Sequence, residues 1–227
     1  MFITKKYTKL VQKMKHLNTY ITEYIVKKKL DKPIDSEDHY KYFPKTKEEL
    51  ISNIKELFDK GETNLNIIDT SKITDMSHLF GDIVNNINKI NFDVSRWDVS
   101  KVENMHSMFF DCKKFDCDLS RWDVSNVKKT SYMFYDCESF EGKGLEKWDV
   151  SNVKDMTCMF GNCIKFEGKG LEKWNVSKVE YMMRMFIGCD NFTGEQIENW
   201  KIKKDCSKFE MLSNCKNIKN KPSWYTK

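Results

Sequence analysis

One unit of 25 or 26 residues recurs along most of the chain. Its form is Trp-Asp-Val-Ser-Asn-Val-x-x-Met-x-x-Met-Phe-x-x-Cys, and a worn copy begins at Ile68. The clear copies begin at Trp97, Trp122, Trp148, Trp174 and Trp200, in steps of 25, 26, 26 and 26 residues. A unit this short cannot bury its own apolar face, so the copies are predicted to stack into a solenoid.

Two local patterns alternate within each unit. Leu145-x-x-Trp148-x-Val150 has the form of the leucine-rich-repeat strand, and six such segments predict a parallel sheet along one side. After the strand, Val153, Met156 and Met159-Phe160 recur at helical spacing and predict a short helix or helical turn. The expected fold class is therefore α/β, a leucine-rich-repeat-like β/α solenoid with about six repeats.

The residues before the repeats predict a helical N-terminal region. Residues 1–30 carry apolar side chains on one helical face and Lys on most of the remainder. Thr46-Lys47-Glu48-Glu49 has the form of a capping box ahead of a second helix, and Gly61 is its expected stop. The predicted divisions are 1–62 for the helical region and cap, 63–218 for the repeats, and 219–227 for a tail.

The positive charge is confined to the first quarter of the chain. The protein has 227 residues and a formal net charge of +5. Residues 1–60 hold 14 Lys and 9 acidic residues, so the remainder is neutral and the repeats lack the basic patch of a nucleic-acid binder. The basic helix over 1–30 could cover the open end of the solenoid, or it could associate with a membrane or nucleic acid.

The positions of the cysteines indicate a structural role rather than a catalytic or metal-binding one. Cys112, Cys137, Cys163, Cys189 and Cys215 occupy one repeat position, as small buried residues stacked between coils would. Reduced thiols are expected, because a column of five cannot pair completely. No zinc site and no cofactor are expected, because apart from His106 no His lies near the pairs Cys112/Cys117 and Cys158/Cys163 in the sequence. No P-loop, G-x-S-x-G or H-E-x-x-H motif is present, so no enzyme is expected.

A charged column along the predicted strands is the candidate binding surface. In four of the five clear copies the residue after the Trp is acidic or amide, at Asp98, Asp123, Asp149 and Asn175, while Lys201 takes this place in the last copy. In the same four copies the residue before the Trp is basic, at Arg96, Arg121, Lys147 and Lys173, and could pair with these acids. Two interpretations stay open: an outward face that binds a protein partner, or side chains that cap the following turn through backbone amides.

The repeat motif resembles that of BspA-like leucine-rich-repeat proteins, over residues 65 to 218. Such repeats occur in bacterial surface proteins, mycoplasma lipoproteins and large DNA viruses of protists. The resemblance implies a non-catalytic protein–protein interaction or structural scaffold module, with self-association as a further option. Without an apolar export segment or spanning run, the expected location is a virion or the host cytoplasm rather than a cell surface. The alternative is an adhesin-like surface module.

Overall fold

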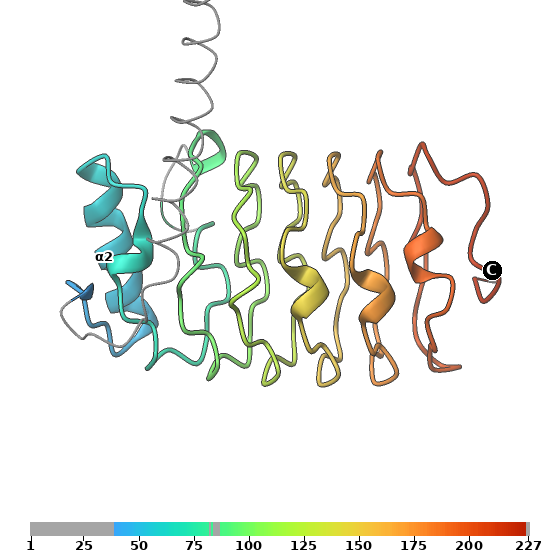
Figure 1. The fold of residues 1–227 in the computed structure, drawn as a ribbon, viewed down its shortest axis with the longest axis horizontal. Helices are drawn as coiled ribbons and strands as arrows, with labels where there is room; N and C mark the ends of the chain where they lie inside the picture. Colours follow the sequence, from blue (N-terminus) through green and yellow to red (C-terminus); the bar gives the residue numbers. More distant parts are fainter. Residues whose placement is uncertain (1–38, 82, 84–86, 226–227) are drawn as a thin grey trace, which may run out of the picture. The chain divides into compact units, whose positions relative to one another are not determined.

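The computed structural model describes residues 39–81, 83 and 87–225 (Figure 1). The chain divides into two units, Met1–His39 and Tyr40–Lys227. The predicted basic helix over 1–30 lies outside the described residues. All structural statements below concern the second unit.

The predicted second helix is confirmed as α2, Lys47–Asp59. Thr46 Oγ1 accepts a hydrogen bond from the Glu49 amide at 3.2 Å, and the Glu49 carboxylate accepts one from the Lys45 amide at 2.6 Å. Thr46 thus caps the helix as predicted, whereas the Glu49 carboxylate bonds to the amide one residue before the N-cap amide that a capping box uses. Leu50, Ile54 and Leu57 are buried against the first repeat coil. Helix α2 therefore covers one end of the repeat core.

The expected α/β class and leucine-rich-repeat-like β/α solenoid are wrong. Among the described residues α2 is the one α-helix, and extended pairing is limited to isolated parallel bridges. The other elements are single 3₁₀ turns: η2 Leu65–Ile67, η3 Ile87–Lys89, η4 Leu145–Lys147, η5 Leu171–Lys173 and η6 Glu195–Ile197. The repeats form a row of irregular coils (Figure 1).

The predicted Trp strands fail because their amides bond within their own coil. Gly144 takes a φ of 91° and leads into η4. The amide of Trp148 then donates to the carbonyl of Leu145 at 3.2 Å, which closes a turn. An amide used in this way cannot donate to a neighbouring strand. Two parallel bridges, Tyr42–Ile68 and Asn64–Asp93, lie at the start of the row. The others lie away from the Trp segments, at Asp75, Asn104, Lys129, Asp155, Tyr181 and Ser207 in successive coils.

The side of the coils that carries these bridges is a wall of consecutive turns, here called the turn wall. It consists of 75–81, 104–111, 129–136, 155–162, 181–188 and 207–214. Alternate amides bond to the next coil: Met156 to Tyr181 O, Cys158 to Met183 O, Phe160 to Met185 O and Asn162 to Ile187 O, at 2.8, 2.9, 2.9 and 2.7 Å. The amides between them close turns within the coil, as Met159 does onto Met156 O at 3.2 Å.

This alternation explains why the predicted short helix is absent. Cys158 and Asn162 adopt positive φ values of 53° and 58°, which interrupt any helix and turn every second amide outward along the row. The three-residue spacing of apolar side chains therefore comes from consecutive turns. The turns that join Met156 to Met159 and Phe160 to Cys163 have an apolar residue at both ends, and those four residues face the core.

The core is built from columns of aromatic rings. The indoles of Trp122, Trp148, Trp174 and Trp200 stack at centroid distances of 6.2, 6.4 and 6.5 Å, with interplanar angles of 2°, 3° and 6°. A second column runs through Phe109, Phe134, Phe160 and Phe186 at 5.4, 5.7 and 5.7 Å. The inward placement of the Trp column, predicted from its repeat position, is confirmed.

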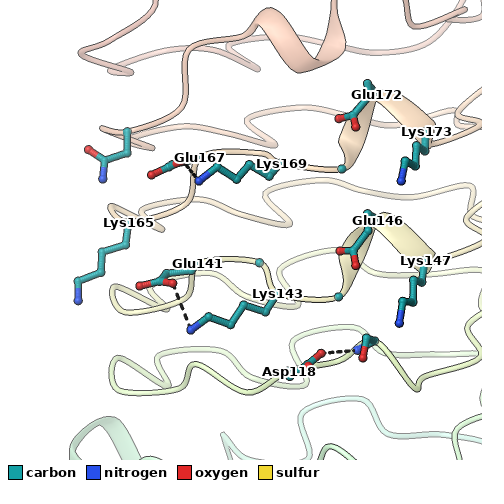
Figure 2. A pocket seen from close by; sticks show the side chains of 15 residues that line it. Asp118, Glu141, Lys143, Glu146, Lys147, Lys165, Glu167, Lys169, Glu172 and Lys173 are labelled. Carbon is teal, nitrogen blue, oxygen red and sulfur yellow. Dashed lines mark hydrogen bonds and ion pairs between the residues drawn. The ribbon is translucent and has the colours of Figure 1, made fainter. Parts of the chain in front are cut away.

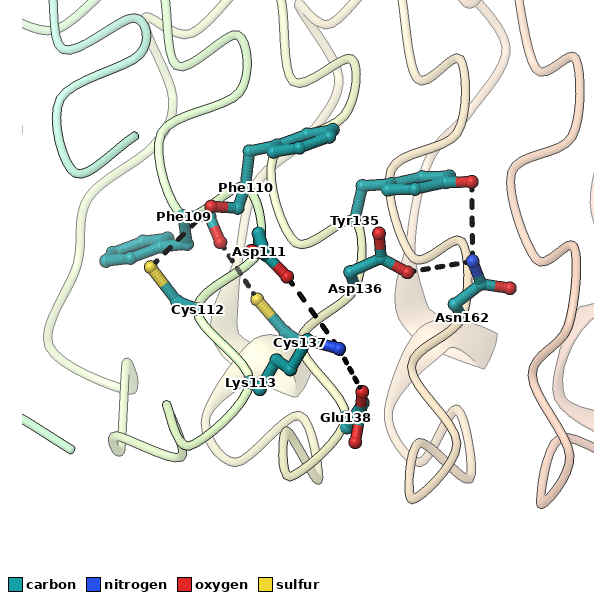
Figure 3. A network of polar contacts seen from close by, with 10 residues as sticks. All are labelled: Phe109, Phe110, Asp111, Cys112, Lys113, Tyr135, Asp136, Cys137, Glu138 and Asn162. Carbon is teal, nitrogen blue, oxygen red and sulfur yellow. Dashed lines mark hydrogen bonds and ion pairs between the residues drawn. The ribbon is translucent and has the colours of Figure 1, made fainter. Parts of the chain in front are cut away.

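The cysteine column joins neighbouring coils through the backbone. The Cys137 thiol contacts the carbonyl of Phe109 at 3.1 Å (Figure 3). Cys163 repeats the contact with Phe134 O at 2.9 Å. All eight cysteines are free thiols in the structure. Burial raises the pKa of Cys137 and Cys163 well above that of an exposed thiol. These cysteines are therefore packing residues, as predicted.

Candidate functional site

Two neighbouring coils present the same loop, Glu-Gly-Lys-Gly-Leu-Glu-Lys, at residues 141–147 and 167–173. The loops line an open groove of about 880 Å³ (Figure 2). Lys and acidic side chains dominate its walls, five of each, and the labelled side chains lie in matching order on the two loops. We refer to this feature as the loop groove.

Glycine holds the loops against the coils that precede them. Gly144 has a φ of 91°, and a Cβ atom there would lie 2.1 Å from the backbone nitrogen of Ser120. At Gly170, with a φ of 90°, a Cβ atom would lie 2.4 Å from the Cβ of Glu146. Only glycine fits both the backbone conformation and the close approach. The Gly-Lys-Gly segments are thus packing devices that fix the spacing of the charged residues around them.

Part of the charge in the loop groove is neutralised locally. Lys143 Nζ lies 2.7 Å from Asp116 Oδ2 and 3.1 Å from Glu141 Oε2. Lys169 Nζ pairs with Glu167 at 2.5 Å. Hydrogen bonds to these carboxylates raise the pKa of both ammonium groups. The two lysines are therefore committed to contacts within the protein.

The predicted acidic column is exposed and caps turns. In each of four coils the side chain accepts a hydrogen bond from the amide of the Ser two residues later. The distances are 3.0 Å for Asp98, Asp123 and Asp149, and 3.2 Å for Asn175. Bonding to Ser151 lowers the pKa of Asp149. Turn capping accounts for the recurrence of these residues, while a role in binding a partner stays a prediction.

The predicted basic column is divided between two environments. Arg96 is half-buried and Arg121 is exposed. Lys147 and Lys173 are exposed and line the loop groove. Within residues 39–225, as far as they are described, neither lysine forms an ion pair with the acidic column. The structure thus separates Lys147 and Lys173 from the acidic column with which the sequence suggested they could pair.

The acidic residues of the groove were not selected from the sequence. Glu146 and Glu172 precede Lys147 and Lys173 and lie on the same face of the groove (Figure 2). Their signal was the identity of two whole loops 26 residues apart. The groove is lined by residues from several repeat positions, so a comparison of one repeat position at a time does not identify it.

In the part of the chain that the structure describes, no three His, Cys, Asp or Glu side chains lie close enough together to hold a metal ion. His78 and His106 lie ring to ring at 4.8 Å, and His106 Nδ1 is 2.8 Å from Ser131 Oγ. Burial lowers the pKa of His106. In the same part of the chain, no helix is long and apolar enough to cross a membrane.

Comparison with known proteins gives one match. A family model described as "Mycoplasma protein of unknown function, DUF285" matches residues 50–144 and 136–227. The two matches together extend from α2 through the last coil, which is well over half of the chain. No curated protein and no solved structure matches the sequence.

Proposed function

The chain belongs to the DUF285 family, known as the BspA-like repeat family, and from this premise we propose that it is a non-catalytic protein-interaction module. The observation that supports this role is the loop groove, where two coils repeat the same charged side chains in the same order. Charged surfaces of this kind steer association and select partners.

The proposed binding surface consists of charge bands that run from coil to coil. Lys147 lies beside Lys173, and Glu146 beside Glu172, so a basic band follows an acidic band across the groove (Figure 2). The matching partner is a protein segment that carries acidic and basic side chains in the complementary order. Asp98, Asp123 and Asp149 form a second exposed acidic column outside the lining of the groove, and we keep it as a further candidate contact.

Reversal of the basic band tests this function. We expect the double variant Lys147→Glu/Lys173→Glu to fold normally, because both side chains are exposed. In native extract, cross-linking mass spectrometry should recover one recurrent protein with the wild type and lose it with the double variant. With the purified pair, the variant should associate more slowly and with a weaker dependence on salt.

Lys204→Glu/Lys219→Glu is the matched control, since it makes the same charge change at two exposed sites outside the groove. The control should keep the partner. If wild type, double variant and control recover the same proteins, or if the wild type yields only links within the chain, the loop groove is not the binding surface.

The proposed setting is a virion or the cytoplasm of an infected host, where the module would act as a scaffold. The support is the resemblance of the repeat to members encoded by large DNA viruses of protists. Immunoblotting of purified particles tests it: co-purification with the capsid is expected, and recovery only at the surface of a bacterial cell would favour the adhesin-like alternative.

A further inference from the structure

The turn wall carries an apolar strip that runs from coil to coil. Phe110, Tyr135, Gly161 and Ile187 hold the same position in four successive segments of the wall, and we call these four residues the apolar strip. The Phe110 side chain is 36% exposed. Its ring lies 5.4 Å from the Tyr135 ring, with an interplanar angle of 8° (Figure 3). No member of the strip lines the loop groove, so the two surfaces are separate.

Gly161 keeps the strip continuous between Tyr135 and Ile187. A Cβ atom at Gly161 would lie 2.5 Å from Tyr135 Cδ2 and 3.2 Å from Ile187 Cγ2, so both side chains lie against the glycine. Neighbouring hydrogen-bonded coils lie about 4.8 Å apart, and the four positions therefore extend over about 14 Å. This length suits a short segment of another chain.

A carboxylate without an ion pair lies beside the aromatic rings. Asp111 and Asp136 follow Phe110 and Tyr135 in the sequence and lie on one side of the two rings (Figure 3). Asp111 Oδ1 is 4.0 Å from Lys113 Nζ, whereas Asp136 forms no ion pair within the described part of the chain. The turn-wall residues around the strip contain no Lys, at 105–111, 130–136, 156–162 and 182–188. A basic group of a partner is therefore the matching charge at Asp136.

The Tyr135 hydroxyl is placed to donate a hydrogen bond to a ligand. Asn162 Nδ2 donates to Tyr135 Oη at 3.3 Å and to Asp136 Oδ1 at 2.8 Å (Figure 3). A phenol that accepts this bond keeps its own proton for another acceptor. Among the side chains and carbonyls that the structure describes, none takes that proton. A carbonyl of a bound segment can do so.

The backbone of the strip is already bonded. Its four amides close turns within their own coils, at 3.2, 3.2, 3.1 and 3.1 Å, onto the carbonyls of Ser107, Tyr132, Cys158 and Arg184. A β-strand added here would need free backbone groups, and an α-helix bonds its own carbonyls, which leaves none for Tyr135. A polyproline II segment has no internal hydrogen bonds, keeps its carbonyls free and packs Pro rings on aromatic side chains.

We propose that the apolar strip binds a proline-rich segment of a partner protein in the polyproline II conformation. Pro rings pack on Phe110 and Tyr135, a carbonyl accepts from the Tyr135 hydroxyl, and a basic residue beside the prolines pairs with Asp136. At a rise of about 3.1 Å per residue, about five residues cover the strip. The 227 residues hold three Pro, no two of them adjacent, so a second copy of these residues does not supply such a segment.

NMR titration of the full chain with synthetic peptides tests the proposal. The probes are Arg-Pro-Leu-Pro-Pro-Leu-Pro and its reverse, both with blocked ends, because a polyproline II helix can dock in either direction. Binding should shift the amide signals of the four strip residues and leave those of the loop groove in place. A peptide with every Pro replaced by Ala should not bind. Replacement of the peptide Arg by Glu should raise Kd about fivefold.

Two variants with matched controls locate the contacts. Phe110→Ala removes a ring from the contact and should raise Kd about tenfold, whereas Phe209→Ala changes an exposed turn-wall ring outside the strip and should not. Tyr135→Phe keeps the ring and loses the donor, so Kd should rise about two- to tenfold. Tyr181→Phe is its control, at an exposed site outside the strip. Unchanged spectra away from the strip establish that each variant folds.

The pattern of shifts and affinities separates the outcomes. Shifts confined to the strip, with both controls binding like the wild type, support the proposal. Absence of shifts with both probes, equal binding of the Ala peptide, or shifts confined to the loop groove overturns it. Equal Kd values for Phe110→Ala and Phe209→Ala do so as well. The variant Lys147→Glu/Lys173→Glu should bind the peptides like the wild type, and a loss there would also overturn the proposal.

Discussion

Individual polar atoms in the core are satisfied by the backbone of the preceding coil. Trp174 Nε1 donates to Leu145 O at 2.8 Å, and the Cys189 thiol contacts Phe160 O at 2.9 Å. Both side chains are buried. The Trp and Cys of each repeat therefore fill core space and also donate a hydrogen bond to a buried carbonyl. Another apolar residue of similar size would fill the space without making that bond.

Loss of one indole donor should be costly. Trp174→Phe removes the indole donor to the Leu145 carbonyl, which keeps the amide of Trp148 as its one donor, and opens space between Trp148 and Trp200. We expect a loss of about 0.5–1.5 kcal/mol in the free energy of unfolding for the missing hydrogen bond, with a further loss from the smaller ring. Urea denaturation measures it. Trp224→Phe removes the same kind of bond at a partly exposed site, and an equal loss there would contradict the role of burial.

The buried thiols should make stability fall at high pH. Burial raises the pKa of Cys137, Cys163 and Cys189 well above that of an unfolded thiol. Their stabilising effect is therefore complete below the unfolded pKa, near 8.5, and declines as pH rises through and above it. Each thiol should contribute a slope of about 1.4 kcal/mol per pH unit there.

Chemical denaturation between pH 7 and pH 10.5 measures this slope. Cys163→Ala removes one titrating group and should make the decline shallower, whatever its effect at pH 7. An unchanged slope in this variant would show that other groups cause the decline.

At the scale of local elements, the spacing of apolar residues was informative and its interpretation was wrong. Spacings of three and four residues usually indicate a helix. Here the left-handed residues Cys158 and Asn162 convert the same spacing into consecutive turns. Neither residue is a glycine, so the sequence gave little indication that the backbone takes a left-handed conformation at these positions. The Thr46 cap of α2, by contrast, depends on a side chain within one turn and was predicted correctly.

The loop glycines should differ sharply in their tolerance of a side chain. Gly144→Ala places a Cβ atom 2.1 Å from the Ser120 nitrogen at a φ of 91°. We expect a loss of at least about 3 kcal/mol, from backbone strain and displacement of the loop. Gly81→Ala is the matched control, since only His78 O lies near its Cβ position, at 3.8 Å. Thermal unfolding of both variants checks this, and similar melting temperatures would contradict the close approach.

At the scale of the whole molecule, each coil contacts mainly its neighbours, so the repeat number and the stacking followed from the sequence alone. The candidate surface did not. Asp149 and Lys147 were considered as a pair, but the turn that follows Asp149 uses its carboxylate, while Lys147 faces the loop groove. Which columns share a face depends on the path of the coil. The path of the coil was predicted wrongly, because the β-strand was assigned to the Trp segments, whereas the hydrogen bonds between coils lie on the turn wall.

Removal of one whole coil should preserve the fold. Deletion of residues 149–174 joins Trp148 to Asn175 and keeps every column in register. We expect a cooperative unfolding transition at a lower temperature, because one interface between coils is lost. Deletion of residues 149–161 alone would place turn-wall residues in the Trp column, and calorimetry should show no such transition. Equal behaviour of the two deletions would contradict independent stacking.

The Trp column also has an optical consequence. Its indoles are nearly parallel and regularly spaced, at 6.2 to 6.5 Å between successive centroids. Chromophores held in this way share their excitation, so light absorbed by one indole passes along the row before it is emitted. Separation of the coils on unfolding should end this transfer, and each indole should then emit as an isolated chromophore.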